Sequence, residues 1–213
     1  MRGLYVITDG STGDTLLSKV EQALRGGAAI VQYRDKTTDQ ARREQEAAAL
    51  RSLCQHHNAL FIINDDVALA KAVQADGVHV GRDDSALNAA RQALGKAAII
   101  GVSCYNRLEL ALDAAAQGAD YVAFGSFFAS PTKPHAPHAT LDLLQTARQQ
   151  LRLPICTIGG ITLDTAPTLL ANGADMLAVI TDVFNSPDIA QQAARYQALV
   201  LAQAQVRGIP HPV

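Results

Sequence analysis

The sequence has few aromatic side chains and no tryptophan. Aromatic residues make up 5% of the 213 residues, whereas hydrophobic residues of all kinds make up 48% and alanine is frequent. A β-sandwich core is usually filled with large side chains, so this composition favours helices packed closely on a sheet. At this length the chain is expected to form one domain with a large buried core.

Cysteine, net charge and long apolar segments are also scarce. The three cysteines (Cys54, Cys104 and Cys156) are odd in number, far apart and without Cys-x-x-Cys spacing, so a reduced, cytoplasmic setting is expected. A formal charge of −2 gives no reason to expect nucleic acid or an acidic membrane as partner. The first apolar run, 4–7, is soon broken by polar residues, and no segment has membrane-span length. We therefore predict a soluble cytoplasmic protein whose anion sites are local clusters.

Short apolar runs alternate with longer stretches of helical pattern. The runs are 4–7, 30–31, 60–63, 77–80, 99–102, 121–124, 155–158 and 176–180. The helical stretches are 15–25, 39–56, 67–74, 85–94, 107–117, 141–150, 163–171 and 188–206. Strands that are apolar throughout indicate a sheet covered on both faces. Asp14, Asp84 and Asn106 are expected to cap the helices that follow them, and Gly26, Gly95, Gly118 and Gly173 to end helices in the left-handed conformation.

A short phrase of small residues recurs before every second strand. Its four copies are Gly27-Ala28-Ala29, Gln74-Ala75-Asp76, Gly118-Ala119-Asp120 and Gly173-Ala174-Asp175. Eight strand–helix units with a fourfold repeat predict an α/β fold, a single (β/α)8 TIM barrel over residues 1–213 with a loosely held tail from about 207. An open doubly wound sheet is disfavoured because no Gly-x-Gly-x-x-Gly follows the first strand.

The second strand ends in polar residues that alternate with others. Gln32, Arg34 and Lys36 lie on one face of an extended chain and together suit a polyanionic group. A strand that simply runs out into solvent would have a similar composition, so the pattern alone leaves both interpretations open.

Carboxylates follow the third and fourth strands. Asp65 and Asp84 follow neighbouring strands and are close enough to share one Mg²⁺, with water and substrate phosphate as further ligands. Alternatively, Asp84 caps a helix and Asp65 forms a turn. Asp66 and Asp83 are also available, and the pattern does not decide which pair binds the metal.

A second anion site is predicted at strands seven and eight. The Gly159-Gly160 turn is expected to lead straight into a helix, whose N-terminus, together with Ile180 and Thr181, suits a phosphate. The long connection 125–139 offers Ser130, Thr132 and Lys133 as a closing clamp. Two anion sites suggest two phosphorylated substrates, one of which loses diphosphate. His79 is expected to be a polar residue of a strand layer, not a base, and Cys104 is not expected to be a nucleophile.

These motifs together resemble the thiamine-phosphate synthase family. The resemblance covers nearly the whole chain and rests on Gly3-Leu-Tyr-Val-Ile-Thr-Asp9, Val31-Gln-Tyr-Arg-Asp-Lys36, Ile63-Asn-Asp-Asp66, Gly77-Val-His-Val-Gly81, Ser130-Pro-Thr-Lys133, Ile158-Gly-Gly-Ile161 and Leu177-Ala-Val-Ile180. It implies condensation of 4-amino-2-methyl-5-hydroxymethylpyrimidine diphosphate with thiazole (carboxylate) phosphate, by a dissociative substitution assisted by one Mg²⁺ per site.

The resemblance also implies residue roles. The pyrimidine diphosphate would be bound by Gln32, Tyr33, Arg34, Asp35, Lys36, Asn64, Ser103 and Lys133, of which Arg34, Lys36 and Lys133 would be catalytic. The thiazole phosphate would be bound by Ser130, Pro131, Thr132, Gly160, Ile180 and Thr181, and the metal by Asp65 and Asp84. Tyr33 and Asp35 depart mildly from the family pattern, which commonly has Leu and Glu.

Two other functions are weighed against this one. A thiazole tautomerase of the same barrel family would bind one phosphorylated thiazole, and the intact run from Gln32 to Lys36 argues against it. A phospholigand-sensing barrel is disfavoured because no effector or DNA-binding segment is recognisable. Homo-oligomer formation is left open.

Overall fold

The strands form a closed parallel barrel, as predicted. The computed structural model describes residues 1–81, 84–129 and 138–208, without the side chains of Asp84 and Ser85. Its strands pair in chain order, and the last pairs with the first. They are β1 (Gly3–Ile7), β2 (Ile30–Tyr33), β3 (Leu60–Asn64), β4 (Gly77–Val80), β5 (Ile99–Tyr105), β6 (Tyr121–Phe124), β7 (Ile155–Ile158) and β8 (Met176–Val179).

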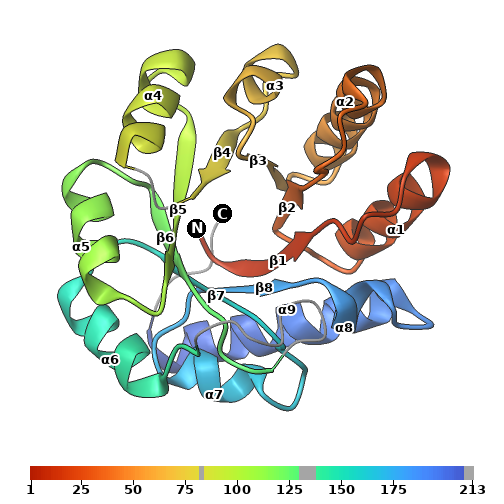
Figure 1. Ribbon diagram of the computed structural model, residues 1–213. Coiled ribbons are helices and arrows are strands. Elements are labelled where there is room, and N and C mark those ends of the chain that lie inside the picture. Colours follow the sequence, from red (N-terminus) through yellow and green to blue (C-terminus); the bar gives the residue numbers. More distant parts are fainter. Residues whose placement is uncertain (82–83, 130–137, 209–213) are drawn as a thin grey trace.

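Helices surround the barrel (Figure 1). They are α1 (Gly13–Arg25), α2 (Gln40–His56), α3 (Val67–Ala72), α4 (Asp84–Leu94), α5 (Leu108–Ala116), α6 (Leu141–Gln150), α7 (Ala166–Ala171), α8 (Thr181–Phe184) and α9 (Ile189–Val206). Over the described part of the chain, no helix combines the length and apolarity needed to cross a membrane.

Most strands contribute to two separate cores. Side chains such as Val31, Phe61 and Val122 face outward and pack under the helices. Their neighbours along the strands face the barrel axis and fill the interior, with Tyr121 and Met176 among the most buried. Because both faces of every strand are covered, the apolar runs are continuous, as expected of an all-parallel sheet.

The repeated phrase has a structural role at the N-terminal end of the barrel. In three of its copies the aspartate accepts a hydrogen bond from a backbone N–H of the preceding strand and pairs with an arginine of a nearby helix. The sets are Asp76 with Phe61 and Arg51, Asp120 with Ile100 and Arg91, and Asp175 with Ile155 and Arg148. The repeat therefore ties successive strands and helices together.

The first copy of the phrase, Gly27-Ala28-Ala29, lacks the aspartate, so the N–H of the neighbouring strand has a different acceptor. Ala29 replaces the aspartate, and the backbone N–H of Leu4 donates instead to Oε1 of Gln197 on α9, at 3.1 Å. A Cβ at Gly3 would overlap the Ala29 methyl group, so space is limited where the chain closes the barrel.

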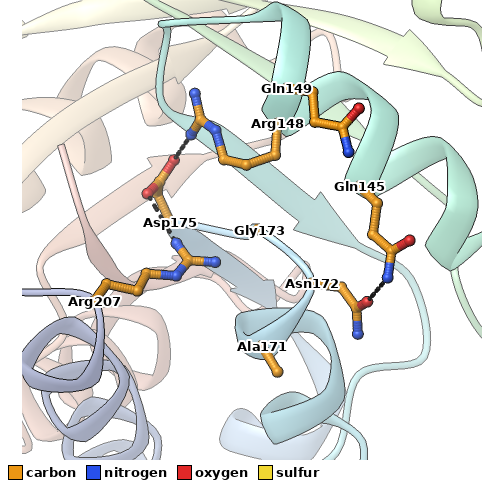
Figure 2. Close-up of a pocket in the computed structure, with 8 residues that line it drawn as sticks. All are labelled: Gln145, Arg148, Gln149, Ala171, Asn172, Gly173, Asp175 and Arg207. Atoms are coloured by element: carbon orange, nitrogen blue, oxygen red, sulfur yellow. Dashed lines mark hydrogen bonds and ion pairs between the residues drawn. The ribbon is translucent and has the colours of Figure 1, made fainter.

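Asp175 lies at the centre of an arginine cluster beside a pocket. Its carboxylate is 2.8 Å from Arg148, 3.6 Å from Arg207 and 3.7 Å from Arg2. Figure 2 shows Asp175 between Arg148 and Arg207 in a pocket of about 490 Å³. Burial lowers the pKa of Arg207; Asp175 opposes that shift, whereas Arg148 and Arg2 add to it. Because Asp175 directly precedes β8, this pocket lies at the N-terminal end of the barrel, which serves stability in this fold.

Several helix starts differ from the sequence predictions. Helix α7 begins at Ala166, not at 163, because Pro167 is tolerated only in the first helical turn. Asp14 lies inside α1, whose first residue Gly13 donates its N–H to Glu46 of α2 at 2.7 Å. A distant side chain thus replaces the predicted local cap.

Other terminal predictions were partly wrong. Arg107, not Asn106, is the N-cap of α5. Gly26 ends α1 with φ of −77°, and the left-handed conformation falls on Gly27 instead. Gly95, Gly118 and Gly173 do have positive φ, as expected.

Candidate active site

Cationic residues follow β2 at the carboxyl end of the barrel. Gln32 is buried, and its Nε2 donates to the Tyr5 hydroxyl at 2.7 Å. Arg34 is half-buried and Lys36 exposed. Within the described ranges no carboxylate forms an ion pair with either one. The backbone N–H of Arg34 donates to Thr8 Oγ1 at 2.9 Å, which fixes the start of this segment. Both cations are thus available to an anionic ligand.

The alternate residues of this segment contact α2. The Tyr33 hydroxyl donates to Glu46 at 2.7 Å, and Asp35 pairs with Arg42 at 2.8 Å. Burial raises the pKa of Tyr33, and Glu46 raises it further. Burial also favours a higher pKa for Asp35, but hydrogen bonds from Thr37 and the Arg42 charge outweigh it and lower the pKa. Tyr33 and Asp35 therefore attach the β2 segment to the helix layer.

Asp65 occupies a strained turn at the end of β3. Its φ is +61°, and the N–H of Asp66 donates to the carbonyl of Asn64 across it at 2.7 Å. Its own N–H donates to the carbonyl of His79 on β4 at 2.8 Å. Such a conformation costs about 1–3 kcal/mol outside glycine and is frequent at functional sites. The exposed carboxylate accepts one hydrogen bond, from Asn64 at 2.8 Å.

The structure separates Asp65 from Asp66. One Asp66 oxygen caps α3 through Leu69 N at 2.9 Å, and the other pairs with Arg43 at 2.8 Å. Asp65 has no cationic partner among the described side chains, so its carboxylate fits a hard divalent cation, which typically takes few protein carboxylates. Asp83 and the Asp84 side chain fall outside the description; elsewhere no group of three possible ligands occurs.

The barrel interior is polar near β4 and β5, just below its mouth, the opening at the carboxyl ends of the strands. His79 Nδ1 lies 2.9 Å from the Tyr121 hydroxyl and Nε2 lies 2.8 Å from Ser103 Oγ. Burial lowers the pKa of His79 to about 4, and Asp65 opposes the shift. His79 therefore has the surroundings expected of a strand-layer residue. Burial raises the pKa of Cys104 to about 12, which agrees with its not being a nucleophile.

Two loops meet beside β7. Gly159 and Gly160 have φ of 105° and 61°, and a Cβ on Gly159 would overlap Ser126. Phe128 N donates to the Gly159 carbonyl at 3.0 Å. The glycines thus let the segment after β6 approach the β7 loop closely. The expectation that Gly159-Gly160 leads straight into a helix was wrong, because α7 starts only at Ala166.

The end of β8 carries a helix that the sequence reading missed. Helix α8 starts at Thr181, directly after Ile180, and spans four residues. A short extra helix beside the seventh and eighth strands is a common part of phosphate sites in this fold. The apolar residues Val183 and Phe184 had suggested no separate element.

The predicted clamp stays a prediction. Ser130, Pro131, Thr132 and Lys133 all lie outside the described residues. The other predicted residues lie at the carboxyl ends of β2, β3, β5, β7 and β8, although Tyr33 and Asp35 face the helices. Asp84 follows β4 and is the first residue of α4, not the residue that precedes the helix as a cap. Sequence reasoning missed Tyr5 and Tyr121, whose hydroxyls lie inside the barrel; a tyrosine within a wholly apolar strand was the available signal.

Comparison with known proteins gives consistent matches. A family model described as thiamine monophosphate synthase matches residues 4–183. A thiamine-phosphate synthase of Azoarcus sp. is 55% identical over 200 residues, covering 93% of this chain and 97% of the relative. One from Thioalkalivibrio sulfidiphilus is 53% identical over 201 residues, covering 93% and 95%. A solved thiamine phosphate pyrophosphorylase from Pyrococcus furiosus superposes with a TM-score of 0.84 at 35% identity, covering 94% and 96%.

Proposed function

Because the chain belongs to the thiamine monophosphate synthase family, we propose that it joins 4-amino-2-methyl-5-hydroxymethylpyrimidine diphosphate to thiazole (carboxylate) phosphate, releasing diphosphate. The chain is a transferase, since its relatives at more than half identity are thiamine-phosphate synthases. The observation that carries the choice of substrates is the pair of cations Arg34 and Lys36, which follow β2 and form no ion pair with a described residue, beside Asp65, which follows the neighbouring strand β3.

The proposed diphosphate site is built on β2 and β3. Arg34 would bind phosphate oxygens with its planar fork, and Lys36 would add a mobile charge. Gln32 and Asn64 would contact the substrate from the strand ends, with Ser103 on the pyrimidine side and Lys133 closing from the long loop. Tyr33 and Asp35 would act by holding the segment on α2 through Glu46 and Arg42.

The proposed thiazole phosphate site lies at β7 and β8. Gly160, Ile180 and Thr181 would bind the phosphate with backbone groups and a hydroxyl at the start of α8. Ser130, Pro131 and Thr132 would cover it. The two sites would hold the thiazole nitrogen against the carbon that carries the leaving diphosphate.

We propose a dissociative reaction. The bond between the pyrimidine methylene carbon and the diphosphate oxygen breaks first, both bonding electrons leave with the diphosphate, and the thiazole nitrogen donates its lone pair to the resulting cation. Arg34 and Lys36 stabilise the charge on the departing group. This chemistry needs no strong base, which is compatible with a His79 whose ring nitrogens both have protein partners.

Mg²⁺ is part of the proposal. Asp65 and Asp84 would hold it, and when bound it would neutralise diphosphate charge. Asp66 is not a proposed ligand, because both of its oxygens are engaged by α3 and Arg43. A cytoplasmic location, and a homo-oligomeric state if one exists, are likewise proposals.

The deciding experiment mixes both substrates with Mg²⁺ and measures diphosphate. We expect release only when both substrates are present, and loss of release when a chelator removes the metal. Isomerisation of the thiazole without diphosphate release would instead identify a tautomerase. Binding of either compound without turnover would identify a sensing barrel.

A further inference from the structure

A continuous chain of hydrogen bonds crosses the interior of the barrel. Gln32 Nε2 donates to the Tyr5 hydroxyl at 2.7 Å, and the hydroxyls of Tyr5 and Tyr121 are 2.8 Å apart. Tyr121 then lies 2.9 Å from His79 Nδ1, and His79 Nε2 lies 2.8 Å from Ser103 Oγ. The first four side chains are at most 9% exposed, whereas Ser103 is partly exposed. The chain thus links β2 to β5 beneath the mouth.

The absence of a side chain at Gly101 makes room for the Tyr121 ring in this chain of hydrogen bonds. Gly101 on β5 faces the Tyr121 ring, and a Cβ there would overlap it. The Tyr121 ring also stacks on His79, with centroids 5.6 Å apart and an interplanar angle of 28°. Tyr121 is therefore held where its hydroxyl reaches Tyr5 and His79 together.

The hydrogens of this chain can be counted. Gln32 Nε2 can only donate, so the Tyr5 oxygen accepts from it. If Tyr121 also donated to Tyr5, the Tyr5 hydrogen would have no acceptor in a site that is 1% exposed, which is costly. Tyr5 therefore donates to Tyr121, and Tyr121 donates to Nδ1 of His79. Neutral His79 then carries its hydrogen on Nε2 and donates it to Ser103 Oγ.

This polarity has a consequence for the ligand. The Ser103 oxygen already accepts from His79, so its own hydrogen is free to point to the mouth. We propose that His79 is a positioning residue that keeps the Ser103 hydroxyl hydrogen available to the ligand, and that the substrate atom accepting this hydrogen is an unprotonated ring nitrogen of the pyrimidine. The identity of the ligand rests on the proposed function, whereas the donor-to-acceptor direction of the hydrogen bonds from Gln32 to Ser103 does not.

The direction is tested without any assay of activity. Nitrogen-15 NMR of the full-length wild-type protein, with the His79 signals assigned by their loss in His79→Gln, reports which ring nitrogen carries the hydrogen. We expect hydrogen on Nε2 and a bare Nδ1 at neutral pH. Hydrogen on Nδ1 would overturn the proposal, since it requires the Gln32 amide to be rotated and every bond of the chain reversed.

The link to the substrate is tested by steady-state kinetics on two conservative variants. In His79→Gln the side-chain amide nitrogen lies about as far from the backbone as Nε2 of histidine, so a donor to Ser103 is kept. In His79→Asn the amide nitrogen lies only as far out as Nδ1 and does not reach Ser103. For His79→Asn we expect KM for the pyrimidine diphosphate to rise about tenfold, with little change in KM for the thiazole phosphate. His79→Gln should recover most of that loss, and the exposed surface variant His56→Gln should behave as wild type.

The outcomes separate the inference from the proposed function. Equal KM values in His79→Gln and His79→Asn would refute the positioning role, even if NMR found the expected tautomer. A wild-type protein that releases no diphosphate would refute the proposed function and the assignment of the pyrimidine nitrogen. The NMR result would still decide the direction of the chain in that case.

Discussion

At the scale of single residues, Arg34 and Lys36 are cations at the carboxyl end of the barrel that form no ion pair with any described carboxylate. Most other arginines at strand ends or in helices are engaged, as Arg43 is with Asp66 and Arg148 with Asp175. An ion pair between a surface cation and a carboxylate contributes little to folding stability. Leaving Arg34 and Lys36 without a carboxylate partner therefore has little cost in stability. Their availability is better explained by a ligand than by packing.

The first prediction concerns catalysis. Replacing Lys36 or Arg34 by alanine should lower kcat by about 10²–10³, because in the proposed reaction each would supply positive charge to the departing diphosphate. Lys71→Ala, on an exposed position of α3, is the matched control and should retain wild-type kcat. Initial rates of diphosphate release measure all three, and near-normal turnover in both site variants would contradict the assigned role.

The second prediction concerns pH and His79. Its pKa falls from 6.5 in the unfolded chain to about 4 in the fold. Between these values the unfolded state binds a proton that the folded state does not, so the free energy of unfolding should fall as the pH falls from 6.5 towards 4. The His79 contribution is about 1 kcal/mol per pH unit. Urea unfolding at pH 5 and pH 7 should show a smaller pH effect in His79→Gln; identical effects would contradict the shifted pKa.

At the scale of elements, β5 combines a small residue with an irregularity. Gly101 makes room for Tyr121, and the pairing register with β6 shifts between Ser103 and Tyr105. Bulges of this kind often redirect side chains beside active sites. The apolar pattern of this strand gave its place in the barrel but no sign of the bulge, which depends on pairing with β6.

The third prediction tests the space at Gly101. Gly101→Ala should displace the Tyr121 ring and lower the free energy of unfolding by about 1–3 kcal/mol, as overpacking of a core does. Gly81→Ala is the matched control, because a Cβ there meets no atom of the described residues within 4 Å. Urea denaturation compares the two variants. Equal stability would show that the barrel absorbs the added methyl group.

The starts of helices α7 and α1 show when the local sequence predicts a helix boundary and when it does not. Pro167 marks the start of α7 in the sequence itself, and the longer helix predicted there ignored it. By contrast, α1 starts at Gly13 because Glu46 accepts its N–H from another helix. That contact joins residues far apart in the chain, so no local pattern announces it.

At the scale of the whole molecule, the two ends of the barrel have different roles. The N-terminal end carries Asp76, Asp120 and Asp175. Each of these aspartates accepts a hydrogen bond from the preceding strand and pairs with an arginine of a helix. The carboxyl end carries the strained Asp65 and the two cations, Arg34 and Lys36, that pair with no carboxylate in the described part of the chain. A change at one end should therefore affect stability and a change at the other should affect activity.

The fourth prediction uses this separation. Asp175→Asn removes the charge that Arg2, Arg148 and Arg207 share, so the free energy of unfolding should fall by about 3–5 kcal/mol while KM for both substrates stays unchanged. Asp113→Asn, at an exposed position of α5, should have almost no effect. Urea unfolding and initial rates provide the measurements. A raised KM together with unchanged stability would contradict the division of roles.

The sequence by itself determined the barrel and its strand order, and it proposed candidate site residues at the strand ends. Apolar runs, the repeated phrase and the polar strand ends depend on local spacing, and backbone geometry translates spacing directly into faces and ends of strands. It also led to the family, because several ordered motifs together are specific.

Only the tertiary structure decided which neighbouring residues differ in role. It turned Tyr33 and Asp35 towards α2, engaged both oxygens of Asp66 while leaving Asp65 without a cation, and joined Gln32 to Ser103 through buried hydroxyls and an imidazole. These outcomes depend on which groups from distant strands share a small volume. Closing the barrel brings those groups together and excludes water from them, and no spacing along the chain encodes either effect.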